Sequence, residues 1–129
     1  MPVKVLIVED EVIVAEDIRS KLIAKGYEVT GIVDTFEKAL ESVKANHPDI
    51  MILDIRIKGE ITGVETAIIL ASQFEKSIPV VFLTAFSESD FPVLKAIESY
   101  TFIRKPFTED VLFQAIEKTL TIPKNSFLI

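Results

Sequence analysis

The residues with the clearest chemical potential in this sequence are few: Glu9, Asp10, Asp54, Thr84 and Lys105. Three of them are carboxylates, which repel one another at close range and shift each other's pKa values unless a cation lies between them. Oxygen ligands without His or Cys suit a hard ion, and Mg²⁺ typically takes one or two carboxylates with waters and phosphate oxygens. A lysine adds a point charge suited to a phosphoryl group. If these side chains meet, they favour phosphoryl chemistry with one Asp as a candidate nucleophile.

Each of these residues follows a short apolar run that has the composition of a β-strand. Five such runs occur, at 3–8, 27–33, 50–53, 80–83 and 101–103. The last three are continuously apolar, as strands buried on both faces should be. The run at 27–33 leads instead to Asp34, which we interpret as an ordinary helix cap.

Stretches with helical spacing separate the strands, at 12–25, 36–46, 62–74 and 108–120. The first carries one apolar stripe, made of Val12, Ala15, Ile18, Leu22 and Ile23. Gly26 is placed to end that helix, and Thr62 and Thr108 are placed to cap the last two.

The segment before the last strand contains Pro92. Proline is tolerated only in the first turn of a helix, and the residue before it is biased away from helical angles. We therefore expect a short helix that starts near residues 90–92 and ends before Tyr100. Short helices have little stability of their own, so residues 86–99 should be the least stable part of the domain.

Five strands that alternate with five helices predict an α/β fold with a doubly wound parallel sheet. Sheets of this flavodoxin-like kind commonly have the strand order 2-1-3-4-5, which places strands 1 and 3 side by side at the switch point where ligands bind. The three carboxylates would then form one acidic pocket, with Thr84 and Lys105 on its rim. We expect one domain at residues 1–121 and a C-terminal tail or linker stump at 122–129.

Taken singly, each of these residues has a plainer explanation. The acidic run at 9–11 could favour the start of the next helix through its dipole, and Asp54 could begin a loop. Thr84 could be an ordinary strand residue and Lys105 a surface lysine before Pro106. Together, four such coincidences at one edge of one sheet are improbable.

Composition excludes several classes of protein. The 129 residues carry a net charge of -6, which argues against direct binding to nucleic acid, since that needs a basic surface. The chain has no Cys and a single histidine, His47, so disulfides, thiol catalysis and metal sites built from several Cys or His are excluded. No apolar run approaches the ~18 residues of a membrane span, and acids stand at 9–11, where a signal peptide is apolar. We expect a soluble, cytoplasmic protein that does not bind membranes.

Four motifs of this chain occur together in a known family. The sequences LIVEDE at 6–11, MILDI at 51–55, VVFLTA at 80–85 and FIRKPF at 102–107 resemble the receiver domains of two-component response regulators. The resemblance runs from about residue 4 to residue 120. It implies a phosphorelay switch that is not an enzyme beyond catalysing its own phosphotransfer and autodephosphorylation. The phosphorylated state would be relayed by a conformational change of the face formed by helix 4, strand 5 and helix 5.

The resemblance also implies the chemistry of the site. Asp54 corresponds to the phosphoacceptor, which takes a phosphoryl group from a phosphohistidine on a sensor histidine kinase or a histidine phosphotransfer protein. Mg²⁺, or Mn²⁺ in its place, would be bound by Asp10 and Asp54, by Glu9 largely through water, and by the backbone carbonyl of Arg56. Lys105 corresponds to the lysine that binds the phosphoryl group.

Further positions match the family's switch. Thr84 corresponds to the switch hydroxyl, Ala85 to the small neighbour whose N–H meets a phosphoryl oxygen, and Phe102 to the rotating aromatic. The bond between Lys105 and Pro106 is expected to be cis. The output partner is unknown, and the resemblance allows a phosphorylation-dependent homodimer.

The sequence departs from the common receiver pattern in three places. The loop at 55–63 lacks the usual Pro and runs slightly long, Ser99 and Tyr100 replace the usual Gly-Ala, and Pro92 lies in the expected helix 4. The loop resembles that of a receiver subgroup often linked to sensor kinases and PAS-containing proteins. All three departures lie near surfaces that receivers use for partners.

Three alternatives differ from a stand-alone receiver. The chain could be a receiver excised from a hybrid kinase or a multidomain regulator. It could be a phosphatase that forms an aspartyl phosphate, but the D-x-D-x-T motif of those enzymes is incomplete at residues 54–58, which lack the second Asp and the Thr. It could be a flavin-binding module, but acids occupy the place of the phosphate loop after the first strand.

Overall fold

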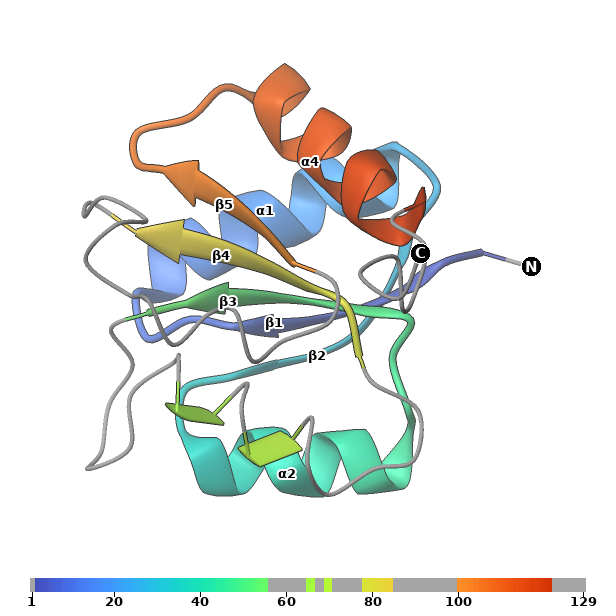
Figure 1. Ribbon diagram of the computed structural model, residues 1–129, viewed down its shortest axis with the longest axis vertical. Coiled ribbons are helices and arrows are strands. Elements are labelled where there is room, and N and C mark those ends of the chain that lie inside the picture. The colour runs from blue at the N-terminus through green and yellow to red at the C-terminus, as the bar shows by residue number, and fades with distance from the viewer. Residues whose placement is uncertain (1, 56–64, 67–68, 71–77, 85–99, 122–129) are drawn as a thin grey trace, which may run out of the picture.

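The computed structural model describes residues 2–55, 65–66, 69–70, 78–84 and 100–121 of the chain (Figure 1). Five strands form one parallel sheet: β1 (Lys4–Val8), β2 (Glu28–Val33), β3 (Ile50–Asp54), β4 (Val80–Thr84) and β5 (Tyr100–Arg104). Their order is β2-β1-β3-β4-β5, which confirms the predicted sheet. The described helices are α1 (Val12–Ala24), α2 (Phe36–Ala45) and α4 (Glu109–Thr121).

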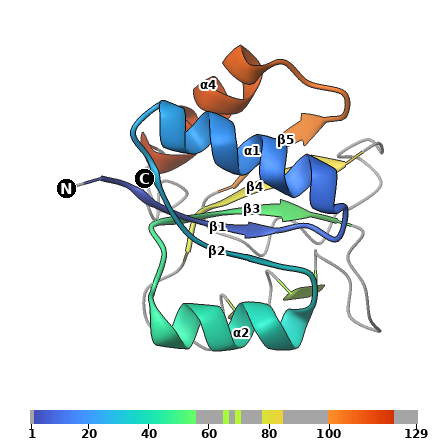
Figure 2. The same ribbon diagram turned by 180° about the vertical axis from the view of Figure 1, so that it is seen from behind.

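The sheet is the middle layer of the fold. Helices α1 and α4 cover one face and α2 lies against the other, as two opposite views show (Figure 1, Figure 2). The inner strands β1 and β3 are apolar because both of their faces are covered. Strand β1 is fully buried from Val5 to Val8, and every residue of β3 is buried. The residues that end or follow β1 and β3 are therefore held by buried strands.

Helix α1 packs on the sheet through a narrower stripe than its pattern predicts. Ala15, Ile18 and Leu22 are buried, but Val12 and Ile23 are 74% and 48% exposed. Successive residues of an α-helix point about 100° apart, so Ile23 turns away when its neighbour Leu22 points inward. Val12 is the first residue of the helix, and its side chain is exposed to solvent there. The expectation that these two residues belong to the buried stripe is wrong.

The end of α1 follows the prediction. Gly26 has a φ of 99°, in the left-handed region that glycine adopts without steric cost. Its N–H donates to the Ile23 carbonyl at 3.1 Å, and the Tyr27 N–H donates to the Leu22 carbonyl at 3.0 Å. These bonds form a Schellman motif, which satisfies carbonyls that would otherwise lack a partner at the helix end.

The start of α2 corrects one prediction. The N-cap is Thr35, whose hydroxyl accepts a hydrogen bond from the Lys38 N–H at 3.2 Å. Asp34, one residue too early to cap, instead pairs with the Lys38 ammonium at 3.0 Å. At α4 the expected cap is confirmed, because the Thr108 hydroxyl accepts from the Val111 N–H at 3.3 Å.

Some expectations concern residues outside the described part of the chain. Of the helix predicted at 62–74, residues 65–66 and 69–70 are described, and they are helical. The short helix expected within 86–99 and the tail at 122–129 are not among the described residues. The total of five helices and the domain boundary at residue 121 therefore stay predictions.

Strand β2 lies at an edge of the sheet and pairs irregularly with β1. Val29 lies opposite Val5, but the next partners are Gly31 and Leu6, so Thr30 is an extra residue on the β2 side. The Thr30 hydroxyl donates to the Val5 carbonyl at 3.4 Å. This arrangement is a β-bulge, which bends a strand and increases its twist.

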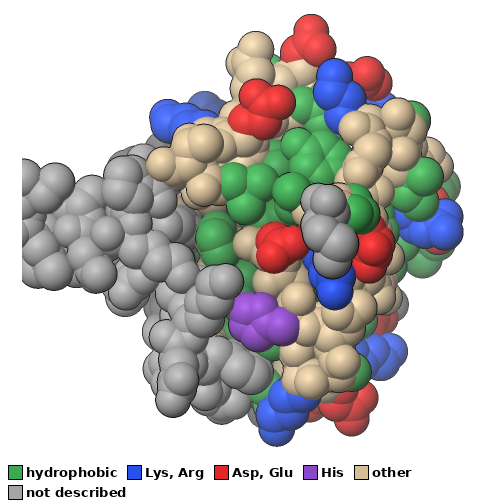
Figure 3. Space-filling model, turned by 90° about the vertical axis from the view of Figure 1, so that its right-hand side faces the viewer, with side chains coloured by type: hydrophobic (Ala, Val, Ile, Leu, Met, Phe, Trp, Pro, Cys, Tyr) green, Lys and Arg blue, Asp and Glu red, His purple; other side chains and the backbone are tan. Residues whose placement is uncertain are grey.

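Figure 3 shows the molecular surface on the side that faces right in Figure 1. Among the described residues on that face, acidic and basic side chains are interspersed, and His47, the single histidine of the chain, is exposed. The residues described on this face therefore form no basic footprint.

Candidate functional site

The carboxyl ends of β1 and β3 lie side by side and carry two acids to the same place. Val8 pairs in register with Leu53; Glu9 follows the first and Asp54 the second. The Glu9 N–H donates to the Val33 carbonyl at 2.9 Å, so Glu9 extends the sheet by one residue. Only 2% of Glu9 and 5% of Asp54 are exposed. The sheet thus holds two buried acids close together.

Four carboxylates meet at this edge. Glu9, Asp10, Glu11 and Asp54 each offer one oxygen, and these four oxygens lie within 4.8 Å of one another. The structure brings the three acids of the predicted pocket together and adds Glu11, for which the sequence suggested only a helix-dipole role. The signal that could have found Glu11 is its place in the same acidic run at the end of the first strand. An all-oxygen set of this kind fits Mg²⁺.

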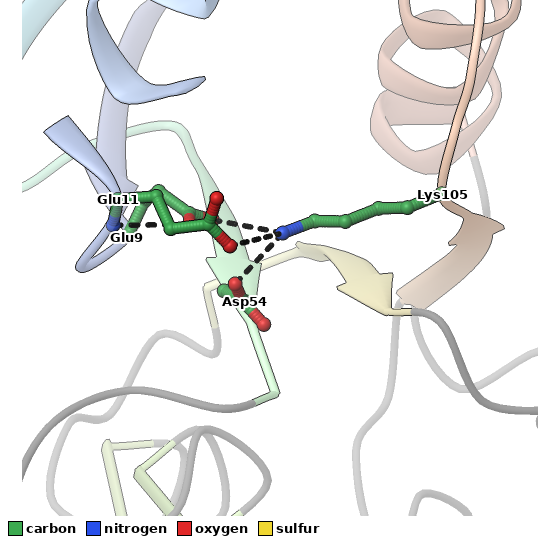
Figure 4. A network of polar contacts seen from close by, with 4 residues as sticks. All are labelled: Glu9, Glu11, Asp54 and Lys105. Carbon is green, nitrogen blue, oxygen red and sulfur yellow. Dashed lines mark hydrogen bonds and ion pairs between the residues drawn. The ribbon is translucent and has the colours of Figure 1, made fainter. Parts of the chain in front are cut away.

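Lys105 reaches these acids from beyond the edge strand β5 (Figure 4). Its Nζ lies 2.9 Å from Asp54 Oδ2, 3.5 Å from Glu9 Oε2 and 3.9 Å from Glu11 Oε1. The Lys105 side chain is 22% exposed. The pairing matters because a buried carboxylate without a partner is costly. The bond between Lys105 and Pro106 is cis, as the resemblance implied.

The pKa of Glu9 is raised from 4.5 to about 8, mainly by burial and also by the hydrogen bond to Asp54 and the Asp54 charge. The Lys105 charge and the Glu11 N–H, which donates to Glu9 Oε1 at 3.3 Å, lower it in part. For Lys105, burial lowers the pKa, but Asp54 and the charges of Glu9 and Glu11 outweigh burial and raise the pKa above its usual 10.5. Without a metal ion, Glu9 therefore holds a proton near neutral pH.

This shift predicts how the stability of the metal-free protein depends on pH. The ordinary pKa of Glu9 is 4.5 and the folded-state pKa is about 8, so the folded chain keeps a proton that the unfolded chain loses between these values. The free energy of unfolding should therefore fall as the pH rises from about 5 to about 8, by on the order of 3 kcal/mol. Urea unfolding in EDTA, followed by circular dichroism, measures this fall.

Saturating Mg²⁺ should abolish the fall, because the cation then takes the place of the proton beside the carboxylates. The control is Glu9→Gln, which has no proton to lose at this position and should show little dependence on pH in this range. An equal fall in Glu9→Gln would show that the proton belongs to another group.

The structure places some of the remaining predicted residues and leaves others undescribed. Thr84 is the last residue of β4 and pairs in register with Arg104, which puts its backbone at the same sheet edge as Asp54. Phe102 is half-buried and packs against the core cluster on the α2 side of the sheet. Arg56 and Ala85 lie outside the described residues.

Comparison with known proteins decides the family. The family profile of the response regulator receiver domain matches residues 5–117. The chain belongs to this family. The transcriptional regulatory protein PdtaR of Mycobacterium tuberculosis is 34% identical over 119 residues, which are 91% of this receiver and 56% of PdtaR. Chemotaxis protein CheY of Bacillus subtilis is 30% identical, over 91% of this receiver and 97% of CheY.

A solved structure supports the same assignment. The signal receiver domain of a modulated diguanylate cyclase from Desulfovibrio desulfuricans matches with a TM-score of 0.81 and 32% identity, over 93% of this chain and 94% of that one. The receiver spans about half the length of PdtaR, whereas it matches nearly all of CheY.

Family membership gives the class of function. This chain is a receiver domain of the two-component type, a signalling domain that acts as a phosphoacceptor switch. The phosphatase-like alternative is not favoured by these findings. Within the described part of the receiver, there is no helix of the length and apolar character that a membrane crossing requires.

Proposed function

We propose that Asp54 is the phosphoacceptor of this receiver and that a phosphohistidine on a sensor histidine kinase or a histidine phosphotransfer protein is its donor. One observation carries the proposal. The Asp54 carboxylate is buried at the end of a central strand, 2.9 Å from the Lys105 ammonium and within the cluster of four carboxylates. The arrangement supports the proposal because it brings together a carboxylate suited to act as a nucleophile, an ammonium suited to a phosphoryl group, and an all-oxygen cluster suited to Mg²⁺.

In this proposal Asp10, Asp54 and the backbone carbonyl of Arg56 would hold Mg²⁺ or Mn²⁺, and Glu9 would act mainly through water. The cation, when bound, supplies charge that offsets the repulsion between an anionic nucleophile and an anionic donor. Beside a bound cation Glu9 would be ionised, because a nearby positive charge favours the carboxylate form.

The transfer itself makes one bond and breaks another. A carboxylate oxygen of Asp54 attacks the phosphorus, the bond between phosphorus and the imidazole nitrogen breaks, and the imidazole leaves. Lys105, which pairs with Asp54 before the reaction, holds a phosphoryl oxygen after it. The Thr84 hydroxyl and the Ala85 N–H bind other phosphoryl oxygens. Attack of water on the phosphorus then breaks its bond to the Asp54 oxygen, releases inorganic phosphate and returns the switch to its starting state.

The wider setting is proposed from the family alone. We place the receiver in the cytoplasm, with a protein or an attached domain as its output partner. It is proposed to make no direct contact with nucleic acid or membrane. A homodimer is the candidate form of the phosphorylated protein. The domain is proposed to end at residue 121. The loop at 55–63 favours the subgroup linked to sensor kinases and PAS-containing proteins.

Incubation of the protein with Mg²⁺ and a small phosphodonor tests the proposal. Intact mass spectrometry should show the addition of one phosphoryl group, and peptide mapping after reduction of the acyl phosphate with borohydride should place it at Asp54. A phosphoryl group mapped to another residue, or none at all under saturating donor and Mg²⁺, would overturn the assignment.

Thr84→Ala should separate phosphorylation from switching. The variant should still accept the phosphoryl group, because Asp54 and Lys105 are intact, but it lacks the hydroxyl that favours the active state. Nuclear magnetic resonance of the Phe102 ring, with and without phosphorylation, measures the switch. The parent should show a shift and Thr84→Ala little or none. The same shift in both proteins would remove Thr84 from the switch.

A further inference from the structure

Glu11 has no part in the proposed reaction, yet it lies at the acidic pocket. It is the N-cap of α1, with φ -86° and ψ 105°, but its side chain makes no capping hydrogen bond. Glutamate is not among the preferred N-cap residues. Its carboxylate instead lies 3.9 Å from the Lys105 ammonium (Figure 4). Glu11 is therefore better explained by the site than by the helix that it begins.

The turn between β1 and α1 fixes the backbone of Glu11. Its N–H donates to Glu9 Oε1 at 3.3 Å, and its carbonyl accepts from the Ala15 N–H at 2.9 Å. Its position therefore depends on the buried Glu9 and on the first turn of α1. These two bonds hold the Glu11 backbone beside the pocket.

Glu11 also differs in exposure from the other acids that pair with Lys105. Its side chain is 65% exposed, against 0% for Glu9 and 7% for Asp54. A phosphodonor arrives from solvent, so it meets the Glu11 charge before it reaches Asp54. The same charge is attracted to the ammonium of Lys105 that has to receive the phosphoryl group.

We propose that Glu11 is a specificity-determining residue for the phosphodonor, because its carboxylate disfavours small, doubly charged phosphate donors relative to less charged ones. The inference rests on the proposed function of Asp54 and deepens it. Repulsion acts on the approaching donor and grows with the charge of the donor. Competition for Lys105 would slow the reaction with any donor, because an ammonium paired with Glu11 is less available to the phosphoryl group. The difference between donors therefore comes from the repulsion.

The expected effect is moderate because Glu11 is exposed and water screens its charge. Interactions of exposed charges of this kind correspond to a factor of about two to five in a rate. An effect of this size is measurable and too small to be confused with loss of the phosphoacceptor.

Glu11→Gln tests the inference, because it removes the charge and keeps the shape. Initial phosphorylation rates of the full chain are measured by intact mass with acetyl phosphate, a dianion near neutral pH, and with phosphoramidate, a monoanion, each at Mg²⁺ saturating for that variant. The rate with acetyl phosphate should rise about two- to fivefold, and the rate with phosphoramidate should rise less. The gain should shrink as salt is raised from about 0.05 to about 0.5 M.

Glu41→Gln is the matched control. Glu41 is an exposed glutamate on α2, outside the acidic site, and the substitution changes the net charge of the chain equally. Its rates should equal those of the parent with both donors. Thermal unfolding of both variants verifies that each is folded at the assay temperature.

The other outcomes distinguish failure of this inference from failure of the proposed function. Any of four results would overturn this inference and leave the proposed function of Asp54 standing. They are equal rates for Glu11→Gln and the parent, an equal gain with both donors, a gain that salt leaves unchanged, and the same gain in Glu41→Gln. A parent protein that takes up no phosphoryl group from either donor would overturn the proposed function of Asp54, and this inference with it.

Discussion

Asp54→Asn is expected to take up no phosphoryl group from a small donor, even with saturating Mg²⁺. An amide is a far weaker nucleophile than a carboxylate and cannot form the acyl phosphate. Asn has nearly the shape of Asp, so the buried end of β3 should stay packed. Intact mass spectrometry after incubation with the donor should show the unmodified mass alone, while the parent protein gains one phosphoryl group.

Two comparisons make this result specific. The parent in excess EDTA should also stay unmodified, because the reaction needs a divalent cation to offset anionic repulsion. Asp17→Asn, which changes an exposed Asp of α1 that pairs with Lys21 at 2.8 Å, should be phosphorylated like the parent. Full modification of Asp54→Asn, or of the parent in EDTA, would contradict the assignment of Asp54 as a metal-dependent phosphoacceptor.

Lys105→Ala is expected to lower the phosphorylation rate about 100-fold at saturating Mg²⁺, the size of effect seen when a preorganised donor to a developing anion is removed. The substitution also deprives Asp54 and Glu9 of the ammonium that lies 2.9 Å and 3.5 Å from their oxygens. In EDTA the free energy of unfolding should therefore fall by about 3 kcal/mol, because breaking a buried ion pair leaves its partner uncompensated.

Mg²⁺ should restore the stability of Lys105→Ala but not its rate of phosphorylation. The cation compensates the carboxylates in the resting protein, whereas the phosphoryl group still lacks its lysine. Lys21→Ala, on the exposed surface of α1, should change the free energy of unfolding by less than about 1 kcal/mol and leave the rate unchanged. Recovery of both quantities in Mg²⁺ would show that Lys105 acts only on stability.

The sheet could be predicted from the sequence because its signals are local. Continuous apolar runs mark the strands, and burial on both sides follows from covering each face with helices, so β3 is buried at every residue. The helix stripe was harder to predict. Ile23 is as apolar as Leu22, and only its angle around α1 turns it to solvent. Val12 is exposed because it lies at the start of the helix, which a periodic pattern does not reveal.

The site could be predicted in outline for a similar reason. In a parallel sheet the carboxyl ends of the strands share one edge, so Asp54 and Glu9 had to lie close together once the order of strands was known. The side-chain geometry could not be predicted. Nothing local distinguishes Glu11, which turns toward Lys105, from an acid that merely favours the start of a helix, since the lysine lies 94 residues further along the chain. The same limit applies to the choice between Asp34 and Thr35 as the cap of α2.

The bulge at Thr30 affects how readily copies of this protein could aggregate through the β2 edge of the sheet. An edge strand offers unpaired N–H and C=O groups to any passing strand, which is how sheets of separate molecules join into aggregates. In β2 the extra residue breaks the regular spacing of those groups midway along the strand and adds local twist. A second strand could therefore not add to this edge in continuous register over the full length of β2. The irregular pairing of β2 therefore disfavours the addition of a strand from another copy of the chain at this edge of the sheet.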